Sequence, residues 1–227
     1  MANLTQLRVL EGLNGFLLVD KPAGIAFPTV VKTVKRKFNL VKVGHGGSLD
    51  AMASGLLVLL INDANKFVGD VMGADRAYTG TLRLGFTTDT GDVHGRPTEP
   101  PAKVPDLSEF RGDIFQTEPR FCAVRREGSA DYEIADTGEH QQFLAHVYRL
   151  EVGAAEGEKR RAPFELRASK GVIVRALAND MGACVESLRR TKVGKFDVAD
   201  AVPFDRLLET EMKDFPSLVL SLSRALG

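Results

Sequence analysis

The chain has 227 residues, of which 44% are hydrophobic and 26% charged, so it has the composition of a soluble globular protein with one large domain or two small ones. Thirty basic and thirty acidic residues give a formal net charge of zero, which argues mildly against a nucleic-acid partner until the local distribution of charge is known. The two cysteines, Cys122 and Cys184, are too few for a disulfide framework and lack metal-ligand spacing. Residues 1–12 have no apolar h-region, so no signal peptide is expected, and the longest apolar run, 56–61, is too short to cross a bilayer. We therefore expect a cytoplasmic protein.

Strands and helices are both predicted along the chain. Residues 15–19 form a short apolar run that ends in the turn 20–24, which indicates a strand. Apolar residues between 30 and 38 then recur at helical spacing, with Thr29 as a suitable N-cap. Further strands are expected at 56–61, 78–84, 164–168 and 193–198, further helices at 172–181 and 204–212, and a surface loop at 87–101. Strands joined by turns outnumber helices, so the predicted class is α+β with a mixed sheet.

Basic residues gather in three segments although the net charge is zero. Residues 28–49 contain no acidic residue, and Lys35 and Arg36 lie in this segment. The second group consists of Arg189, Arg190, Lys192 and Lys195, and the third of residues 159–161 in a predicted hairpin loop. For any one group, a solvated surface is the plainer explanation. Because the first two groups flank the same glycine-rich loop and helix, the distribution favours a surface that holds an RNA backbone.

A glycine-rich loop, residues 44–49, leads directly to Asp50. Glycines let the backbone approach a ligand closely, and a carboxylate on such a loop, just before a buried strand, is suited to nucleophilic catalysis. An aspartate that only caps a turn is the commoner case, and a lone histidine such as His45 is more often a hydrogen-bonded loop residue than a catalyst. Four histidines without ligand spacing give no reason to expect a metal site. The loop also lacks the Gly-Lys-Ser/Thr ending of a phosphate-binding loop, which excludes that kind of NTPase.

Several segments resemble motifs of the TruB family of pseudouridine synthases and follow one another in the family's order. Residues 15–24 (GFLLVDKPAG) resemble the opening motif, and residues 43–50 (VGHGGSLD) resemble the catalytic motif. The other matching segments are 53–55, 76–78, 85–92, 111–114, 169–171 with Arg175, and 188–191. The resemblance implies a pseudouridine-synthase fold, in which a mixed, largely antiparallel sheet is flanked by helices and RNA is held in a central cleft.

The resemblance also implies an activity, the conversion of uridine 55 in the T-loop of tRNA to pseudouridine. Asp50 would be the nucleophilic carboxylate, Tyr78 would stack on the flipped base and take part in proton transfer, and Arg175 would pair with Asp50. A guanidinium beside a carboxylate favours the charged carboxylate and fixes its orientation. A base inside a folded loop must leave its stack to be reached, and a tyrosine ring recovers part of the lost stacking. No cofactor or metal is expected, because the reaction has no redox step and transfers no external group.

The resemblance extends to substrate binding. His45 would contact the substrate or fill the space that opens in the T-loop, and Leu188 would line the base pocket. Ile173 stands where the family usually has an aromatic residue, so its side chain can pack on a base without stacking as a ring does. The expected substrate-binding residues are His45, Lys21, Ile173, Leu188, Arg189, Lys35 and Arg36.

Three further positions depart from the family's pattern. Ala51 replaces the usual proline after the catalytic aspartate, and Cys122 and Arg125 replace the serine and lysine of a Ser-Ala-x-Lys motif. These departures concern affinity and substrate range more than chemistry, because they spare the three expected catalytic residues. The whole chain, 1–227, is expected to be a single catalytic domain without the C-terminal PUA domain of many members.

Transfer RNA, bound through its T-arm, is the expected partner, with no membrane and no obligatory protein partner. The main alternative is a non-catalytic chaperone that folds tRNA on the same scaffold. It is disfavoured because a chaperone does not need the carboxylate of Asp50. A guide-RNA-dependent synthase would be expected to carry a PUA domain and to need protein partners, and a plain interaction module would leave the ordered motif series unexplained.

Overall fold

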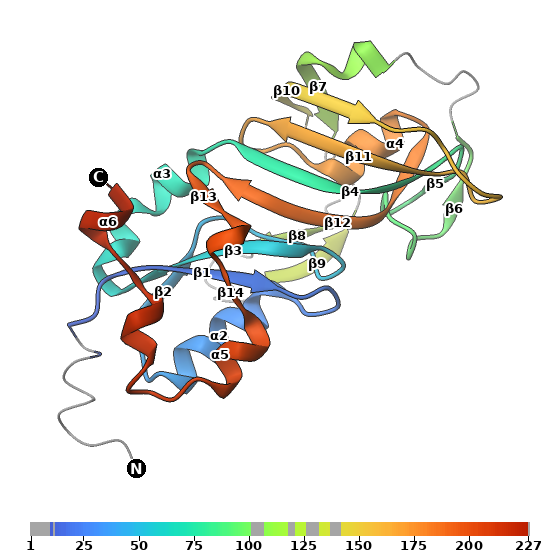
Figure 1. Cartoon of the computed structure of the whole chain (residues 1–227). Coiled ribbons are helices and arrows are strands. Elements are labelled where there is room, and N and C mark those ends of the chain that lie inside the picture. The colour runs from blue at the N-terminus through green and yellow to red at the C-terminus, as the bar shows by residue number, and fades with distance from the viewer. Residues whose placement is uncertain are drawn as a thin grey trace. The chain divides into compact units, whose positions relative to one another are not determined.

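A computed structural model describes residues 10, 12–100, 107–117, 121–125, 132–136 and 142–226 (Figure 1). The chain divides into two compact units, Met1–Ala74 with Arg190–Gly227, and Asp75–Arg189. The motifs of the expected site are divided between these two units.

A pair of long strands forms the centre of the first unit. Strand β1 (Gly15–Lys21) pairs antiparallel with β3 (Ser54–Ile61), with Gly15 opposite Ile61 and Lys21 opposite Gly55. From Gly55 onward every residue of β3 is buried, which agrees with its continuous apolar sequence. The short strands of this unit are β2 (Val43–His45) beside β3, β14 (Val202–Pro203) and β15 (Leu220–Ser221) beside β1, and β13 (Phe196–Asp197), which pairs with the end of β12 (Ala183–Val193).

Helix α2 (Phe27–Lys37) directly follows the turn after β1. It buries Val30 and Val34, as expected from their helical spacing, and also Phe27 in its first turn. The prediction that Thr29 caps this helix was wrong, because the helix begins earlier, with Ala26 at the N-cap and a proline in the first turn, where its missing N–H is tolerated. The other helical segments of the unit are η1 (Asn62–Phe67), α3 (Val68–Gly73), η3 (Val198–Asp200), α5 (Phe204–Glu209), η4 (Phe215–Leu218) and α6 (Leu222–Leu226).

The second unit contains a sheet in which β4 (Arg76–Leu84), β11 (Arg161–Ala168), β10 (Gln142–Val152) and β7 (Gly112–Thr117) pair antiparallel. The strands lie in the order β12, β4, β11, β10 and β7. Buried and exposed residues alternate strictly along β11, so one face of this strand packs into the core and the other faces solvent. The smaller elements are the pairs β5 (Thr87–Thr88) with β6 (Pro97–Thr98) and β8 (Phe121–Arg125) with β9 (Tyr132–Asp136), with η2 (Leu107–Phe110) and helix α4 (Val174–Asp180).

The predicted α+β class is confirmed, and two predicted elements need correction. The strand expected at 193–198 is interrupted, because Gly194, at φ 55°, forms a tight turn that pairs Val193 with Phe196. The surface loop expected at 87–101 is only partly exposed, since Thr88 and Asp92 are buried in it. The side chains of Cys122 and Arg125 lie outside the described part of the structure. Among the described helices, none combines the length and apolarity that a membrane crossing requires.

Candidate active site

Asp50 lies in the loop between β2 and β3, in the first unit, and its side chain is half-buried. The loop is held at both ends by backbone hydrogen bonds, since Gly46 N donates to Val58 O at 2.8 Å and Ala53 N donates to Asp50 O at 3.1 Å. The turn after β1 also reaches this loop, because Gly24 N donates to Ala51 O at 2.7 Å. The carboxylate is therefore carried by a loop whose backbone is fixed by its neighbours.

Close packing or backbone conformation explains three glycines in this loop and at the start of β3. A Cβ atom at Gly46 would overlap the side chain of Val71, and Gly47 adopts a φ of 129° that favours glycine. At the start of β3, Gly55 has a φ of 101°, and a Cβ atom there would overlap the backbone of Arg190. These glycines let the loop pack closely against the core, so their presence does not by itself indicate a bound ligand.

Lys21 ends β1 and is fully buried. Its Nζ donates to the carbonyl oxygens of Pro22 at 2.7 Å, Ile25 at 2.8 Å and Ala51 at 3.3 Å. Burial lowers the pKa of Lys21 from 10.5 to about 8, while the Asp50 carboxylate opposes this change and the Arg190 guanidinium adds to it. In this structure the ammonium binds the loops around Asp50, and its expected contact with substrate stays a prediction.

Arg190, in the last part of β12, is 2% exposed and approaches the same loop. Its guanidinium donates to Leu56 O at 2.8 Å from Nε, to Ser48 O at 2.7 Å from Nη1 and to Gly47 O at 3.4 Å from Nη2. The prediction that Arg190 belongs to a basic surface group was wrong, because its side chain is buried. Alternation along β12 is the signal that separates buried Arg190 from half-buried Arg189, but that strand was not predicted.

His45 occupies β2, five residues before Asp50. Its ring lies against that of Phe27, with 4.9 Å between the ring centroids, and its Nδ1 accepts a hydrogen bond from Gly47 N at 3.3 Å. This bond requires a ring that is unprotonated at Nδ1. His45 therefore helps to shape the loop, and its contact with RNA stays a prediction.

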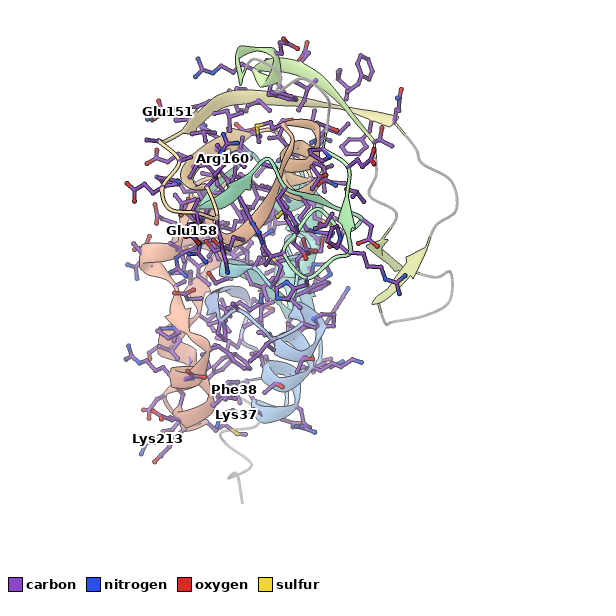
Figure 2. All side chains as sticks on the ribbon, turned by 90° about the vertical axis from the view of Figure 1, so that its right-hand side faces the viewer. Lys37, Phe38, Glu151, Glu158, Arg160 and Lys213 are labelled. Carbon is purple, nitrogen blue, oxygen red and sulfur yellow. The ribbon has the colours of Figure 1, made fainter. Side chains whose placement is uncertain are left out.

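Lys35 and Arg36 are exposed in the last turn of α2. Figure 2 shows Lys37 and Phe38 together at this end of the helix, where the ammonium lies 5.5 Å from the ring centroid. Cations at a helix C-terminus interact favourably with the helix dipole, so this group has a structural reason to be basic in addition to any role in RNA binding.

In the second unit, Tyr78 lies on β4 opposite Leu166 and is 6% exposed. Arg175 lies on α4 and is also buried, and its Nη1 donates to Thr90 O at 2.6 Å. A second link joins the helix to the same loop, because Asn179 Nδ2 donates to Thr88 O at 2.7 Å. Residues 88–90, within the segment 85–92 that was matched to the family without an assigned role, therefore position the helix of Arg175.

Asp92, in this segment, was missed as a site residue. It is 8% exposed, and its Oδ1 accepts hydrogen bonds from Thr90 Oγ1 at 3.1 Å and His94 N at 2.9 Å. A buried carboxylate needs such partners, so Asp92 organises the loop that contacts Arg175. Its position in a matching motif was the only signal in the sequence.

The other expected substrate-binding residues lie on α4 and β12. Ile173 is the N-cap of α4, and its backbone N and O both bind the side-chain amide of buried Gln116, at 3.0 and 3.2 Å. Leu188 is buried in β12 and Arg189 is half-buried. Within the described residues, no group of three or more His, Cys, Asp or Glu side chains is arranged to hold a metal ion.

The structure thus places Asp50, Lys21 and His45 in one unit, and Tyr78 and Arg175 in the other. In the first unit it assembles an aspartate on a rigid loop beside two buried cations. In the second unit, the buried side chain of Arg175 is hydrogen-bonded to the polar loop that contains Thr90. The first arrangement can present a carboxylate of fixed position as a nucleophile.

Comparisons with known proteins identify the family. Residues 35–174 match the family described as TruB family pseudouridylate synthase (N terminal domain). The chain is 39% identical over 211 residues to a protein of Azoarcus sp. strain BH72 named tRNA pseudouridine synthase B, covering 86% of this chain and 70% of that protein. It is 35% identical over 235 residues to the protein of the same name from Bordetella avium strain 197N, covering 94% and 93% of the two chains.

Solved structures show the same fold. A chain in the crystal structure of a Cbf5-Nop10-Gar1 complex matches 96% of this chain with a TM-score of 0.67 at 24% identity, and this chain spans 63% of its length. A chain in the structure of an H/ACA RNP bound to a substrate RNA containing 2'-deoxyuridine matches 92% with a TM-score of 0.62 at 25% identity, and 57% of its length is spanned. On its match to the family and its identity to relatives over most of their length, the chain belongs to the TruB family of pseudouridylate synthases, which are isomerases.

Proposed function

We propose that this chain converts a uridine of tRNA to pseudouridine, that the target is uridine 55 in the T-loop, and that Asp50 is the nucleophile. The observation that carries the proposal is the placement of Asp50 on a loop bound from two sides by the buried side chains of Lys21 and Arg190. Relatives named tRNA pseudouridine synthase B support tRNA as the substrate.

The isomerisation needs no co-reactant. The bond between N1 of uracil and C1′ of ribose breaks, and a bond between C5 and C1′ forms in its place. C5 loses a proton and N1 gains one, so atoms and electrons balance within the nucleotide. The carboxylate of Asp50 attacks the flipped uridine, which lets the base detach, rotate and rejoin through carbon. In this scheme the protein supplies a nucleophile, an extruded position for the base and proton transfer.

Tyr78 and Arg175 take the roles that the family resemblance assigns to them. Tyr78 stacks on the flipped base and takes part in proton transfer, and Arg175 pairs with the carboxylate of Asp50. The buried setting of Arg175 and its 2.6 Å bond to Thr90 support a fixed guanidinium, which a pairing role requires.

Substrate contacts follow the same assignment. His45, Ile173 and Leu188 lie at the base and the opened T-loop. Lys35, Arg36 and Arg189 bind phosphates of the T-arm, and no protein partner is needed. Lys21 contacts the substrate as well, and its ammonium also binds the backbone of the Asp50 loop. The reaction takes place in the cytoplasm, in line with the low cysteine content.

The test is incubation of the purified chain with an unmodified tRNA transcript that carries tritium at C5 of its uridines. Isomerisation releases this tritium to water, and mapping of pseudouridine along the RNA identifies the position. Release of one equivalent, with pseudouridine at uridine 55 alone, is the expected result. A matched transcript with cytidine at position 55 should release none. Binding without any release would support the chaperone alternative, and pseudouridine elsewhere would refute the T-loop assignment.

A further inference from the structure

Arg190 is among the largest fully buried side chains in the described part of the chain. A buried guanidinium is costly unless its N–H groups find acceptors. The acceptors found here are the carbonyl oxygens of Leu56, Ser48 and Gly47. The side chain therefore binds backbone on both sides of Asp50, since Gly47 and Ser48 precede it and Leu56 follows it on β3.

The place of this guanidinium is itself fixed. Gly55 lets β3 approach the backbone of Arg190 so closely that a Cβ atom at this glycine would overlap Arg190 O. The planar guanidinium of Arg190, extending from this fixed backbone, then donates hydrogen bonds to the three carbonyl oxygens and fixes their positions. Directly after Asp50, Ala51 O accepts from Lys21 and from Gly24. The loop is thus bound by side chains from two different strands, Arg190 of β12 and Lys21 of β1.

We propose that Arg190 is a positioning residue, which fixes the place of the Asp50 carboxylate through the carbonyl groups of its loop and does not bind RNA. The inference rests on the proposed role of Asp50 as nucleophile. A nucleophile displaced by about 1 Å loses on the order of 100-fold in rate even when the substrate stays bound. Loss of the Arg190 guanidinium should therefore lower the rate of the chemical step and leave RNA affinity nearly unchanged.

Arg190→Lys and Arg190→Met test this together. Lysine keeps the charge but has one nitrogen for three separated acceptors, and methionine keeps much of the apolar volume without a donor. Under single-turnover conditions, at a temperature where circular dichroism shows a folded protein, we expect the rate on tRNA to fall by about 100-fold in both variants. The Kd for tRNA should stay within about threefold of wild type.

Two controls separate positioning from general loss of stability. Arg206→Met removes an exposed arginine of α5 in the same unit and should keep the wild-type rate. Leu207→Ala truncates a fully buried side chain of the same helix and should lower Tm as a core truncation does, while the rate of the folded protein is kept. If this variant matches Arg190→Lys in Tm and also in lost rate, Arg190 is only structural and the proposal fails.

Amide hydrogen exchange gives a readout that does not depend on activity. In Arg190→Lys, the amides of Gly46 and Ala53, which close the loop, should exchange at least about tenfold faster, while the β1–β3 ladder keeps its protection. Unchanged exchange at both amides would overturn the proposal, as would a rate within about threefold of wild type. If the wild-type chain does not isomerise uridine, the proposed function fails, and exchange still shows whether Arg190 orders the loop.

Discussion

The side-chain nitrogen of Lys21 lies 3.3 Å from the carbonyl oxygen of Ala51, the residue directly after Asp50. The amide of Gly24 donates to the same oxygen. Members of the TruB family usually have proline at this position, and Ala51 lacks the ring that restrains proline. Two hydrogen bonds to one carbonyl oxygen provide restraint at this point, and one of them comes from an amine that titrates in a measurable range.

The rate is predicted to fall as pH rises through about 8, where Lys21 loses its proton. A neutral amine has two N–H donors for three carbonyl acceptors, so the loop loses one bond. Lys21→Met should lack this transition in a pH profile of the single-turnover rate. A wild-type rate that stays flat between pH 7 and 9.5 would contradict the prediction.

The contribution of Lys21 to folding stability should change in the opposite direction. The pKa of this lysine is 10.5 in the unfolded chain and about 8 in the folded one, so between these values the unfolded state binds more protons. The stability contribution of this group therefore rises with pH across that window. Denaturant unfolding of wild type and Lys21→Met at pH 7.5 and 9.5 measures the difference and separates local loss of function from unfolding.

Asp50→Asn should abolish isomerisation and spare binding, because the amide keeps the size of the carboxylate and is not a nucleophile. We expect no detectable tritium release and a Kd for tRNA within about threefold of wild type. Asp63→Asn, an exposed position in the same unit, is the matched control and should behave as wild type. Activity of Asp50→Asn within about tenfold of wild type would remove Asp50 from the catalytic role.

The sequence predicted the strands of the first unit better than the roles of its buried cations. Residues 15–19 and 56–61 are continuous apolar runs, and both lie in long strands. Strand β12 was missed because it mixes charged and apolar residues. Without that strand, Arg190 was grouped with its exposed neighbours, although adjacent residues of a strand face opposite sides. The acceptors of Lys21 and Arg190 are backbone carbonyls, which every residue has, so no side-chain pattern could have revealed them.

Arg175→Lys should slow the reaction by about 100-fold, with a small change in Tm. A lysine side chain can still donate to one acceptor such as Thr90 O. Unlike arginine, it has no second nitrogen with which to bind a carboxylate at the same time. The matched control is Arg167→Lys, because Arg167 is exposed and lies 3.8 Å from Asp75 in a surface ion pair of little energetic weight. Normal turnover of Arg175→Lys would show that the proposed pairing with Asp50 is wrong or unimportant.

Binding of tRNA should weaken steeply with salt, and the cations at the end of α2 should account for part of that slope. Replacing Lys35, Arg36 and Lys37 with glutamine removes up to three phosphate contacts, each worth about 0.7 to 0.9 in the slope of log affinity against log salt. The matched control replaces three other exposed cations of the same unit with glutamine, Arg206, Lys213 and Arg224. It changes the net charge by the same amount and should keep the wild-type slope. An unchanged slope in the α2 variant would place the RNA contacts elsewhere, with Arg189 and Lys192 as the next residues to test.

A hairpin that contains only the T-stem and T-loop should be modified almost as well as full-length tRNA. The expected contacts with the flipped base and the phosphates come from the Asp50 loop, the end of α2, the start of α4 and β12. All of them are assigned to the T-arm under the proposed function. Contacts with remote parts of a substrate contribute binding energy that appears in kcat/KM, so the ratio of kcat/KM on the two RNAs reports how far the contacts extend. We expect this ratio to stay within about tenfold. A drop of about 100-fold or more on the hairpin would mean that the protein also binds tRNA well beyond the T-arm.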